Sequence, residues 1–329
     1  MPGHPHCEVS VTALATGLLL TVLALAACDR TPAPKTHTIG VVNYDPILVP
    51  VLDGFKAKMA ALGYVEGQSV TYVSQGVLQP DPQLIEREVE RLKQQRVDMF
   101  LTLGTVPTQI AKKATVGTTI SVVFAPVLNP VERGLVDSMT RPGGNVTGVH
   151  NGGTIPKALE WLHKVAPRAS TIYTIYHPKD AVAQTATSNL VTLAASMGID
   201  LVLVEARSTD EAIGAIEKLP RSAAIFFVPS PILEPIGPLV QAATRRGLAT
   251  GANNHRSAET GVLVTYAVDW FSMGQQAARL ADQILKGAKP ADLPVETGEH
   301  FLHMNVKTSA AIGLHIPDDL LRQADLVIR

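Results

Sequence analysis

The chain has 329 residues, of which 46% are hydrophobic, and its 28 lysines and arginines nearly balance its 29 aspartates and glutamates. This length suits two domains, and this composition excludes an intrinsically disordered chain. The absence of a basic excess and the aromatic content of 5% argue against nucleic acid as a partner.

The chain opens with an uncharged apolar run over residues 13–27. The run is shorter than the roughly 20 apolar residues of a membrane span, and it suits the core of a signal peptide. It ends in Leu-Ala-Ala-Cys, which resembles the processing site of bacterial lipoproteins, so Cys28 would carry the lipid. We therefore expect a lipid-anchored protein in the periplasm or at the cell surface. The alternatives are an uncleaved anchor and an ordinary signal peptide that leaves a soluble periplasmic protein.

Processing at this site would produce a mature chain that begins at Cys28. Cys7 would leave with the signal peptide, residues 1–27, and a single cysteine cannot form an internal disulfide. Residues 28–35 contain two prolines and are typical of a short, stiff tether. The first ten residues hold no lysine or arginine, which leaves the start codon open, and the sequence leaves open which membrane carries the anchor.

From residue 36 onward, patterns of buried strands and amphipathic helices alternate. Strands are expected at 36–44, 69–76, 97–104 and 119–126, and helices at 50–63, 82–96 and 105–115. Successive βα units of this kind predict a parallel sheet with helices on both faces.

The same pattern begins again after a glycine-rich stretch at 141–145. Further helices are expected at 156–167, 180–198, 209–220 and 235–246, with strands at 170–178, 199–206 and 222–230 and a short segment at 248–252. The tail adds an extended stretch at 261–270, a helix at 271–287 and a strand near 300–306.

These patterns predict an α/β fold with two doubly wound, Rossmann-like parallel-sheet lobes joined by a hinge. The N-terminal lobe would cover residues 36–150 together with about 253–287. The C-terminal lobe would cover residues 151–252 together with about 288–329.

The sequence offers no motif for catalysis, a metal or a cofactor. It lacks the glycine-rich dinucleotide fingerprint, the phosphate-binding P-loop and the G-x-S-x-G nucleophile elbow. The loop at 150–153 resembles an oxyanion-type loop only faintly, and His300 and His303 would point to opposite faces of a strand. We therefore predict no catalytic residue, no metal and no cofactor, and an enzyme is a minor alternative.

Polar and aromatic side chains follow several predicted strands, at the edge where ligands bind to open parallel sheets. Helix N-termini at this edge would also offer amide donors to an anion such as a carboxylate. The pattern predicts a site for a small polar molecule between the lobes. Each residue alone has a structural alternative, because Asn43 can turn the chain, Thr105 can cap a helix and Tyr176 can pack. The strand ends carry Asn43, Tyr44, Asp45, Gly104, Thr105, Ala125, Pro126, Tyr176, His177, Pro229 and Ser230.

Over about residues 38–317, the chain resembles the substrate-binding proteins of bacterial ABC transporters, in particular the tryptophan/tyrosine type with the type I periplasmic-binding fold. The resemblance implies a cleft that closes on a ligand and a complex with an ABC permease and its ATPase. Members of the family bind amino acids, aromatic ones among them. The stretches that carry the resemblance are 53–55 with 62–67, 97–98 with 104–105, 123–125 with 129–130, 134–135, 143–148, and 269–275 with 284–287.

By matching motif positions, the resemblance implies ligand contacts at Thr105 and Ala125 on the first lobe, at Tyr176 and Asp180 on the second, and at Asp269 near the hinge. This chain departs from the family pattern at 176–180, 229–231 and 129–130, which leaves the usual amino-acid ligand open. The full predicted site comprises Asn43, Tyr44, Thr105, Phe124, Ala125, Tyr176, Asp180, Ser230 and Asp269.

Each class of side chain has a predicted role in this site. Thr105 and nearby amides would hold a carboxylate, and an aspartate, Asp180 or Asp269, would meet an ammonium or hydroxyl group. Apolar walls would come from Tyr44, Phe124 and Tyr176. We predict a monomeric, non-catalytic solute-binding component of an ABC importer. The alternative from another class is a sensor module that signals to a membrane receptor.

Overall fold

We describe the fold from a computed structural model of the chain, in which residues 1, 3, 36–230 and 233–329 are described. The chain divides into two units, Met1–Thr36 and His37–Arg329, and every element below belongs to the second unit. The predicted signal peptide, the lipidated Cys28 and the tether lie outside the described residues. Among the described residues, no helix is long and apolar enough to cross a membrane.

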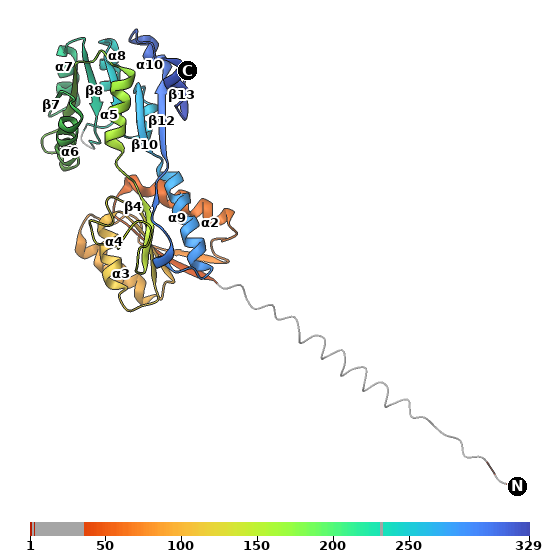
Figure 1. Ribbon diagram of the computed structural model, residues 1–329. Coiled ribbons are helices and arrows are strands. Elements are labelled where there is room, and N and C mark those ends of the chain that lie inside the picture. The colour runs from red at the N-terminus through yellow and green to blue at the C-terminus, as the bar shows by residue number, and fades with distance from the viewer. Residues whose placement is uncertain (2, 4–35, 231–232) are drawn as a thin grey trace. The chain divides into compact units, whose positions relative to one another are not determined.

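The first sheet has six strands in the order β11-β5-β4-β3-β1-β2, and all of its neighbours pair in parallel. Its helices follow the strands in the predicted βα order. The strands are β1 (His37–Asn43), β2 (Val70–Val73), β3 (Met99–Leu103), β4 (Ser121–Val127), β5 (Val146–His150) and β11 (Glu296–Thr297). The helices are η1 (Pro46–Leu48), α2 (Val49–Ala61), α3 (Pro82–Gln94), α4 (Thr105–Ala114), α9 (Trp270–Leu285) and η3 (Pro290–Asp292). Figure 1 shows β4 with α3 and α4 on one side and α2 and α9 on the other.

Both faces of the first sheet are covered because its strands are apolar on both sides. Val41 and Leu101 pack on the side of α2 and α9, whereas the adjacent residues Val42 and Phe100 pack on the side of α3 and α4. This alternation follows from the two-residue side-chain period of a strand, and it explains why the strands read as continuous apolar runs.

Helices α2 and α9 cross closely because each carries a glycine at the contact. A Cβ atom on Gly54 would overlap the carbonyl oxygen of Phe271, and one on Gly274 would overlap that of Val51. Two helices from distant parts of the sequence therefore form one layer on the first sheet.

The second sheet has seven strands in the order β13-β12-β10-β9-β8-β6-β7. All neighbours are parallel except β10 and β12, which pair antiparallel. The strands are β6 (Thr171–Tyr176), β7 (Leu201–Glu205), β8 (Ala223–Phe227), β9 (Ala249–Ala252), β10 (Val264–Val268), β12 (His300–Asn305) and β13 (Leu326–Ile328). The helices are α5 (Thr154–Val165), α6 (Ala181–Met197), α7 (Thr209–Lys218), α8 (Gly237–Arg245), η2 (His255–Ala258), α10 (Val306–Ala311) and α11 (Asp318–Leu321).

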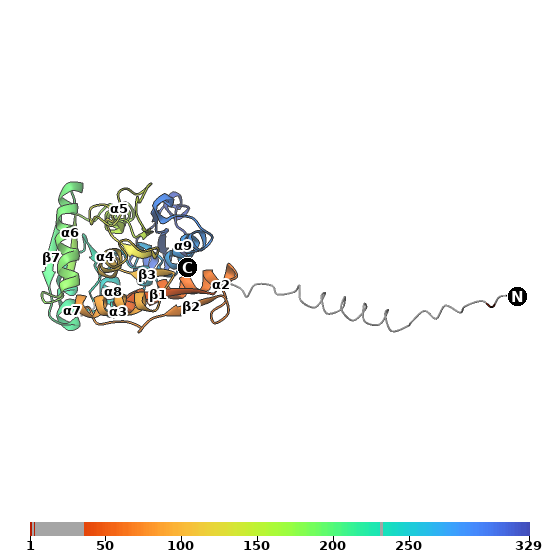
Figure 2. The same cartoon turned by 90° about the horizontal axis from the view of Figure 1, so that it is seen from below.

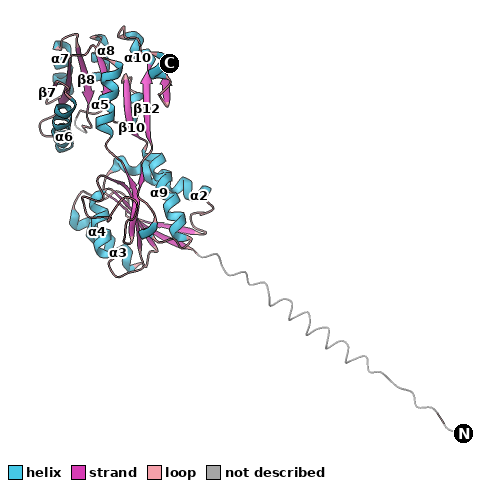
Figure 3. Ribbon diagram, in the orientation of Figure 1, coloured by secondary structure: helices cyan, strands magenta, loops and turns pink. Residues whose placement is uncertain are grey.

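Helices also cover both faces of the second sheet (Figure 3). One core contains residues of α5 and α6, and the other contains residues of α7 and α8. Helix α6 runs alongside the edge strand β7 in both views of the molecule (Figures 1 and 2). The two sheets confirm the predicted α/β class with two doubly wound lobes.

Two segments pair differently from the predicted division into lobes. Strand β10, in the range 253–287 that was assigned to the N-terminal lobe, pairs with β9 and β12 of the second sheet. Strand β11, in the range 288–329 that was assigned to the C-terminal lobe, pairs with β5 of the first sheet. The chain therefore passes between the sheets three times, after β5, β10 and β11.

Candidate functional site

The carboxyl end of β1 is a tight polar turn. Asn43 is 3% exposed, and its Oδ1 accepts a hydrogen bond of 2.9 Å from the amide of Asp45. The Oδ1 of Asp45 in turn accepts one of 3.0 Å from the amide of Ile47, which caps η1. Asn43 thus holds the turn that directs the chain into η1 and α2.

Tyr44 lies over the start of α4. Gly104, which precedes this helix, has φ of 99°, and a Cβ atom there would lie 2.9 Å from Cε1 of Tyr44. Glycine is required at this position both for the positive φ and for the approach of the ring. Burial, with a smaller contribution from Asp45, raises the pKa of the Tyr44 hydroxyl.

Thr105 is the first residue of α4 and does not cap it. The cap is Gly104, which has no side chain to accept a bond. The Thr105 hydroxyl is part-exposed and makes no hydrogen bond to any residue that the structure describes. It therefore remains available beside the amide donors of the helix N-terminus.

Two predicted site residues of β4 belong to the core. Phe124 and Ala125 are both 0% exposed. Phe124 packs with α3 and α4, and Gly148 lies so close that a Cβ atom there would overlap its ring. Ala125 packs on the opposite face of the sheet. Neither side chain has exposed surface to offer a ligand, because β4 is a central strand with both faces covered.

The loops after β6 and β8 meet through a buried pair. Asp180 is 4% exposed and Ser230 is 3% exposed, and the Ser230 hydroxyl donates a hydrogen bond of 2.8 Å to Asp180 Oδ2. Asp180 Oδ1 accepts a further bond of 3.2 Å from the amide of Ala183. Tyr176 points elsewhere and donates a hydrogen bond of 3.3 Å to Glu205 of β7.

A cavity of about 720 Å³ lies within the unit His37–Arg329, between elements of the two sheets. Its walls carry three carboxylates, from Asp53, Glu234 and Asp269, and apolar side chains that include Ile47, Trp270 and Phe271. Among the described residues that line it, none is a lysine or an arginine. The described walls of the cavity thus carry acidic and aromatic groups, which suit a cation with an apolar body.

Asp269 is the one predicted site residue that lines this cavity. It lies between β10 and α9, and its Oδ1 accepts a hydrogen bond of 2.9 Å from the amide of Ser272, which caps α9. The cap fixes the carboxylate at the start of a helix whose position depends on the close crossing with α2.

Sequence reasoning missed the other acidic and aromatic residues of the cavity, and it missed Asn254. Asn254 lies just after β9, where the rule that located the other strand ends applies equally. The two asparagines Asn253 and Asn254 would have indicated the site, but the end of the short segment before them was not counted among the strand ends. Trp270 directly follows Asp269 after β10 but was not singled out, and Glu234 lies seven residues beyond the end of β8, so only the tertiary structure shows that both reach the cavity.

Two histidines flank the crossovers between the sheets, His150 at the end of β5 and His300 at the start of β12. His150 Nε2 lies 2.9 Å from Thr297 Oγ1, and the His300 ring stacks on Tyr266 with centroids 5.3 Å apart. Burial lowers the pKa of both imidazoles, His300 adds to the effect at His150, and a hydrogen bond with the backbone of Asn151 partly offsets it at His300. Over the described part of the chain, no group of three or more side chains could hold a metal ion.

Comparison with known proteins gives consistent matches. A sequence model of the family described as "ABC transporter substrate binding protein" matches residues 39–328. A tyrosine-binding protein of Clostridioides difficile (strain R20291) is 26% identical over 272 residues, which cover 82% of this chain and 78% of the relative.

Two solved structures show the same fold. One is an ABC domain from Streptococcus pneumonia in complex with L-Trp, with 23% identity, a TM-score of 0.67, and coverage of 89% of this chain and 100% of that one. The other is a substrate-binding protein with adhesive properties from Clostridium difficile, in its ligand-free, open form. It has 22% identity, a TM-score of 0.70, and coverage of 89% and 99%.

Proposed function

The chain belongs to the ABC transporter substrate-binding protein family, and from this premise we propose that it binds an amino acid or a related amine outside the cytoplasm and delivers it to a membrane permease. The observation that carries the choice of ligand is the cavity walled by Asp53, Glu234, Asp269 and Trp270. The relatives described as binding tyrosine and L-Trp support the same ligand class.

The ammonium group of the ligand would be held by carboxylates of the cavity. Asp269 is the best placed, because the α9 cap holds its carboxylate through Oδ1. A charge-assisted hydrogen bond is worth about 1.5–3 kcal/mol, more than a neutral one. Trp270 and Phe271 would contact the apolar part of the ligand, and the face of an indole also attracts a cation.

The carboxylate of an amino acid would be held by the first lobe once the lobes close, because Thr105 does not line the cavity in this structure. The free hydroxyl of Thr105 and the N-terminus of α4 support this role, since both present donors. Tyr44 lies against the same helix start and would contribute a wall. Asn43, Asp180 and Ser230 would support the site by holding loops, and Phe124 and Ala125 are left out because they are buried in the core.

Transport requires a change of state when the ligand binds. The three passages between the sheets are the natural hinge, and a ligand that touches both lobes would favour their closure. A shift from mostly open to mostly closed requires a preference for the closed state of about 5.5 kcal/mol. We further propose that the protein is monomeric, performs no catalysis and is tethered to the membrane through lipid on Cys28.

Titration calorimetry with tyrosine, tryptophan and their N-acetyl derivatives tests the ligand class. The free amino acids should bind, and acetylation should weaken binding at least about tenfold because it removes the ammonium charge. If no amino acid or amine in a wider panel raises the melting temperature of the protein, the proposed ligand class is wrong.

The variant Asp269→Asn tests the role of the carboxylate. Asparagine is as good a helix cap as aspartate, so the fold should be kept while the charge is lost. Affinity for a bound amine should fall about 10- to 100-fold, whereas Asp210→Asn, on the distant helix α7, should leave it unchanged. Equal affinity of Asp269→Asn and the wild type would remove Asp269 from the site.

A further inference from the structure

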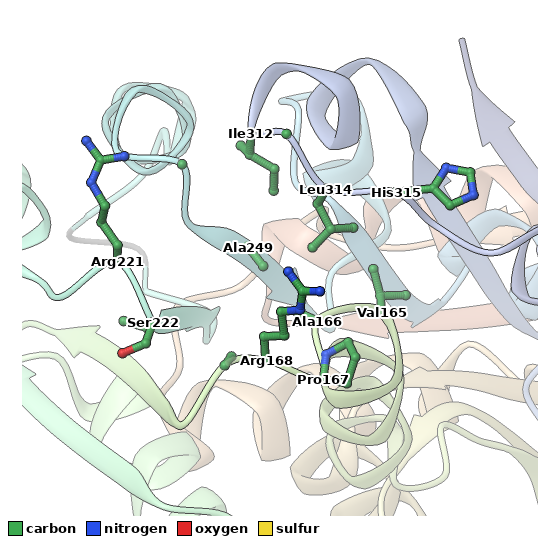
Figure 4. Close-up of a pocket in the computed structure, with 14 residues that line it drawn as sticks. Val165, Ala166, Pro167, Arg168, Arg221, Ser222, Ala249, Ile312, Leu314 and His315 are labelled. Carbon is green, nitrogen blue, oxygen red and sulfur yellow. The ribbon is translucent and has the colours of Figure 1, made fainter.

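A second cavity, of about 680 Å³, lies at the opposite edge of the second sheet, where β6, β8 and β9 begin (Figure 4). It is bounded by the segment after α5, the residues before β8, and the loop after α10. Ligands of parallel sheets bind at the carboxyl ends of strands, so this cavity is separate from the site described above.

The charged side chains of this cavity are all basic. Arg168 and Arg221 line it together with His315, and no aspartate or glutamate does. Both arginines are exposed, and neither makes a hydrogen bond or an ion pair with any residue in the described ranges. In Figure 4 the Arg168 side chain extends between Ala249 and Leu314, and Arg221 rises along the opposite wall.

Beneath these charges the cavity is apolar. Val165, Ala166 and Ala249 are between 1% and 5% exposed and form part of its floor, and Leu314 and Ile312 add aliphatic surface. A small apolar floor below cationic walls is complementary to a molecule with an apolar body and an anionic head.

We propose that this cavity binds an organic anion, a carboxylate or phosphate monoester that carries a short aliphatic or aromatic body. A guanidinium offers paired donors that match the oxygens of either head group. The described residues leave both positive charges at this cavity without a partner, and a bound anion would supply one. Cations that follow helix C-termini also stabilise helices, but that role does not require them to share one cavity.

Chemical-shift mapping of the backbone amides tests the proposal on the mature protein. The probes are hexanoate, hexyl phosphate, hexanamide and inorganic phosphate, which separate the anionic head from the apolar body. At least one of the two amphipathic anions should saturate shifts at Ala166, Ser222 and Gly313. The uncharged amide and inorganic phosphate should each bind about tenfold more weakly or not at all.

Variants separate the arginines from general charge effects. Arg168→Gln and Arg221→Gln should each weaken binding of the amphipathic anion about tenfold, whereas Arg245→Gln, on the outer face of α8, should leave it unchanged. Asp269→Asn should also leave binding of the anion unchanged, because Asp269 lines the other cavity, which is proposed to bind an amine. Failure of one proposal is thereby distinguished from failure of the other. Binding that is insensitive to both arginines, or no binding of either amphipathic anion, would overturn the proposal.

Discussion

At the scale of single residues, burial decides which predicted side chains can act. Phe124 lies in the middle of β4 and is fully buried, whereas Thr105 lies just beyond the carboxyl end of β3 and is part-exposed, with a hydroxyl that bonds to no described residue. The difference arises because strand periodicity places Phe124 under α3 and α4, whereas Thr105 starts a helix. The expectation that ligands bind at the carboxyl ends of strands therefore identifies an edge of the sheet, but it does not identify which side chains there can reach a ligand.

The crossover histidines give a prediction about pH at the same scale. The pKa values of His150 and His300 lie below their ordinary value of 6.5 in the folded protein, mainly because of burial. The unfolded chain then binds more protons than the folded chain as the pH falls below 6.5. The free energy of unfolding should therefore be fully retained above that pH and should decrease as the pH falls below it.

Urea unfolding at pH 7.5 and pH 5.5 measures this loss of stability, because these values lie roughly one pH unit above and below the ordinary pKa of histidine. The double variant His150→Gln/His300→Gln should lose less stability on acidification than the wild type. His163→Gln, which alters an exposed histidine of α5, should behave as the wild type does. An equal pH dependence in the double variant would show that these two imidazoles do not govern the effect.

At the scale of elements, one close helix crossing positions residues of the cavity proposed to bind an amine. Helices α2 and α9 are separated by more than 200 residues in sequence and lie in contact through Gly54 and Gly274. Asp269 and Trp270 begin α9, and Asp53 belongs to α2, so the crossing brings these residues to the same cavity.

Gly274→Ala should destabilise the protein by about 1–3 kcal/mol, because its methyl group would overlap the Val51 carbonyl. Gly214→Ala is the matched control, since that glycine also lies in a helix but has nothing within 4 Å of a new Cβ atom. The control should raise stability by up to about 1 kcal/mol, because alanine has the higher helix propensity. Urea unfolding of both variants gives the comparison, and equal effects would disprove the steric account.

At the scale of the whole molecule, the proposed function depends on attachment to a membrane as well as on binding. The predicted lipid on Cys28 would keep the binding unit close to its permease, and residues 28–35 would be the tether that the sequence predicts.

Cys28→Ala should move the protein from the membrane fraction to the soluble fraction if processing still releases the chain, or leave an unprocessed precursor with residues 1–27 attached. Fractionation combined with mass spectrometry of the N-terminus distinguishes the two. Ligand affinity should not change, because Cys28 lies outside the binding unit His37–Arg329. A processed chain that begins at residue 28 and remains on the membrane would contradict lipidation at this cysteine.

The sequence by itself determined the class of fold, the alternation of strands and helices, and the edge of the sheet at which to look. These features follow from local periodicity, which each segment carries alone. Only the tertiary structure decided that β10 joins the second sheet and β11 the first, that Phe124 is buried, and that Asp53, Glu234 and Trp270 share a cavity with Asp269. Pairing at a sheet edge and the convergence of distant loops depend on long-range packing. No periodic pattern in the local sequence encodes these contacts.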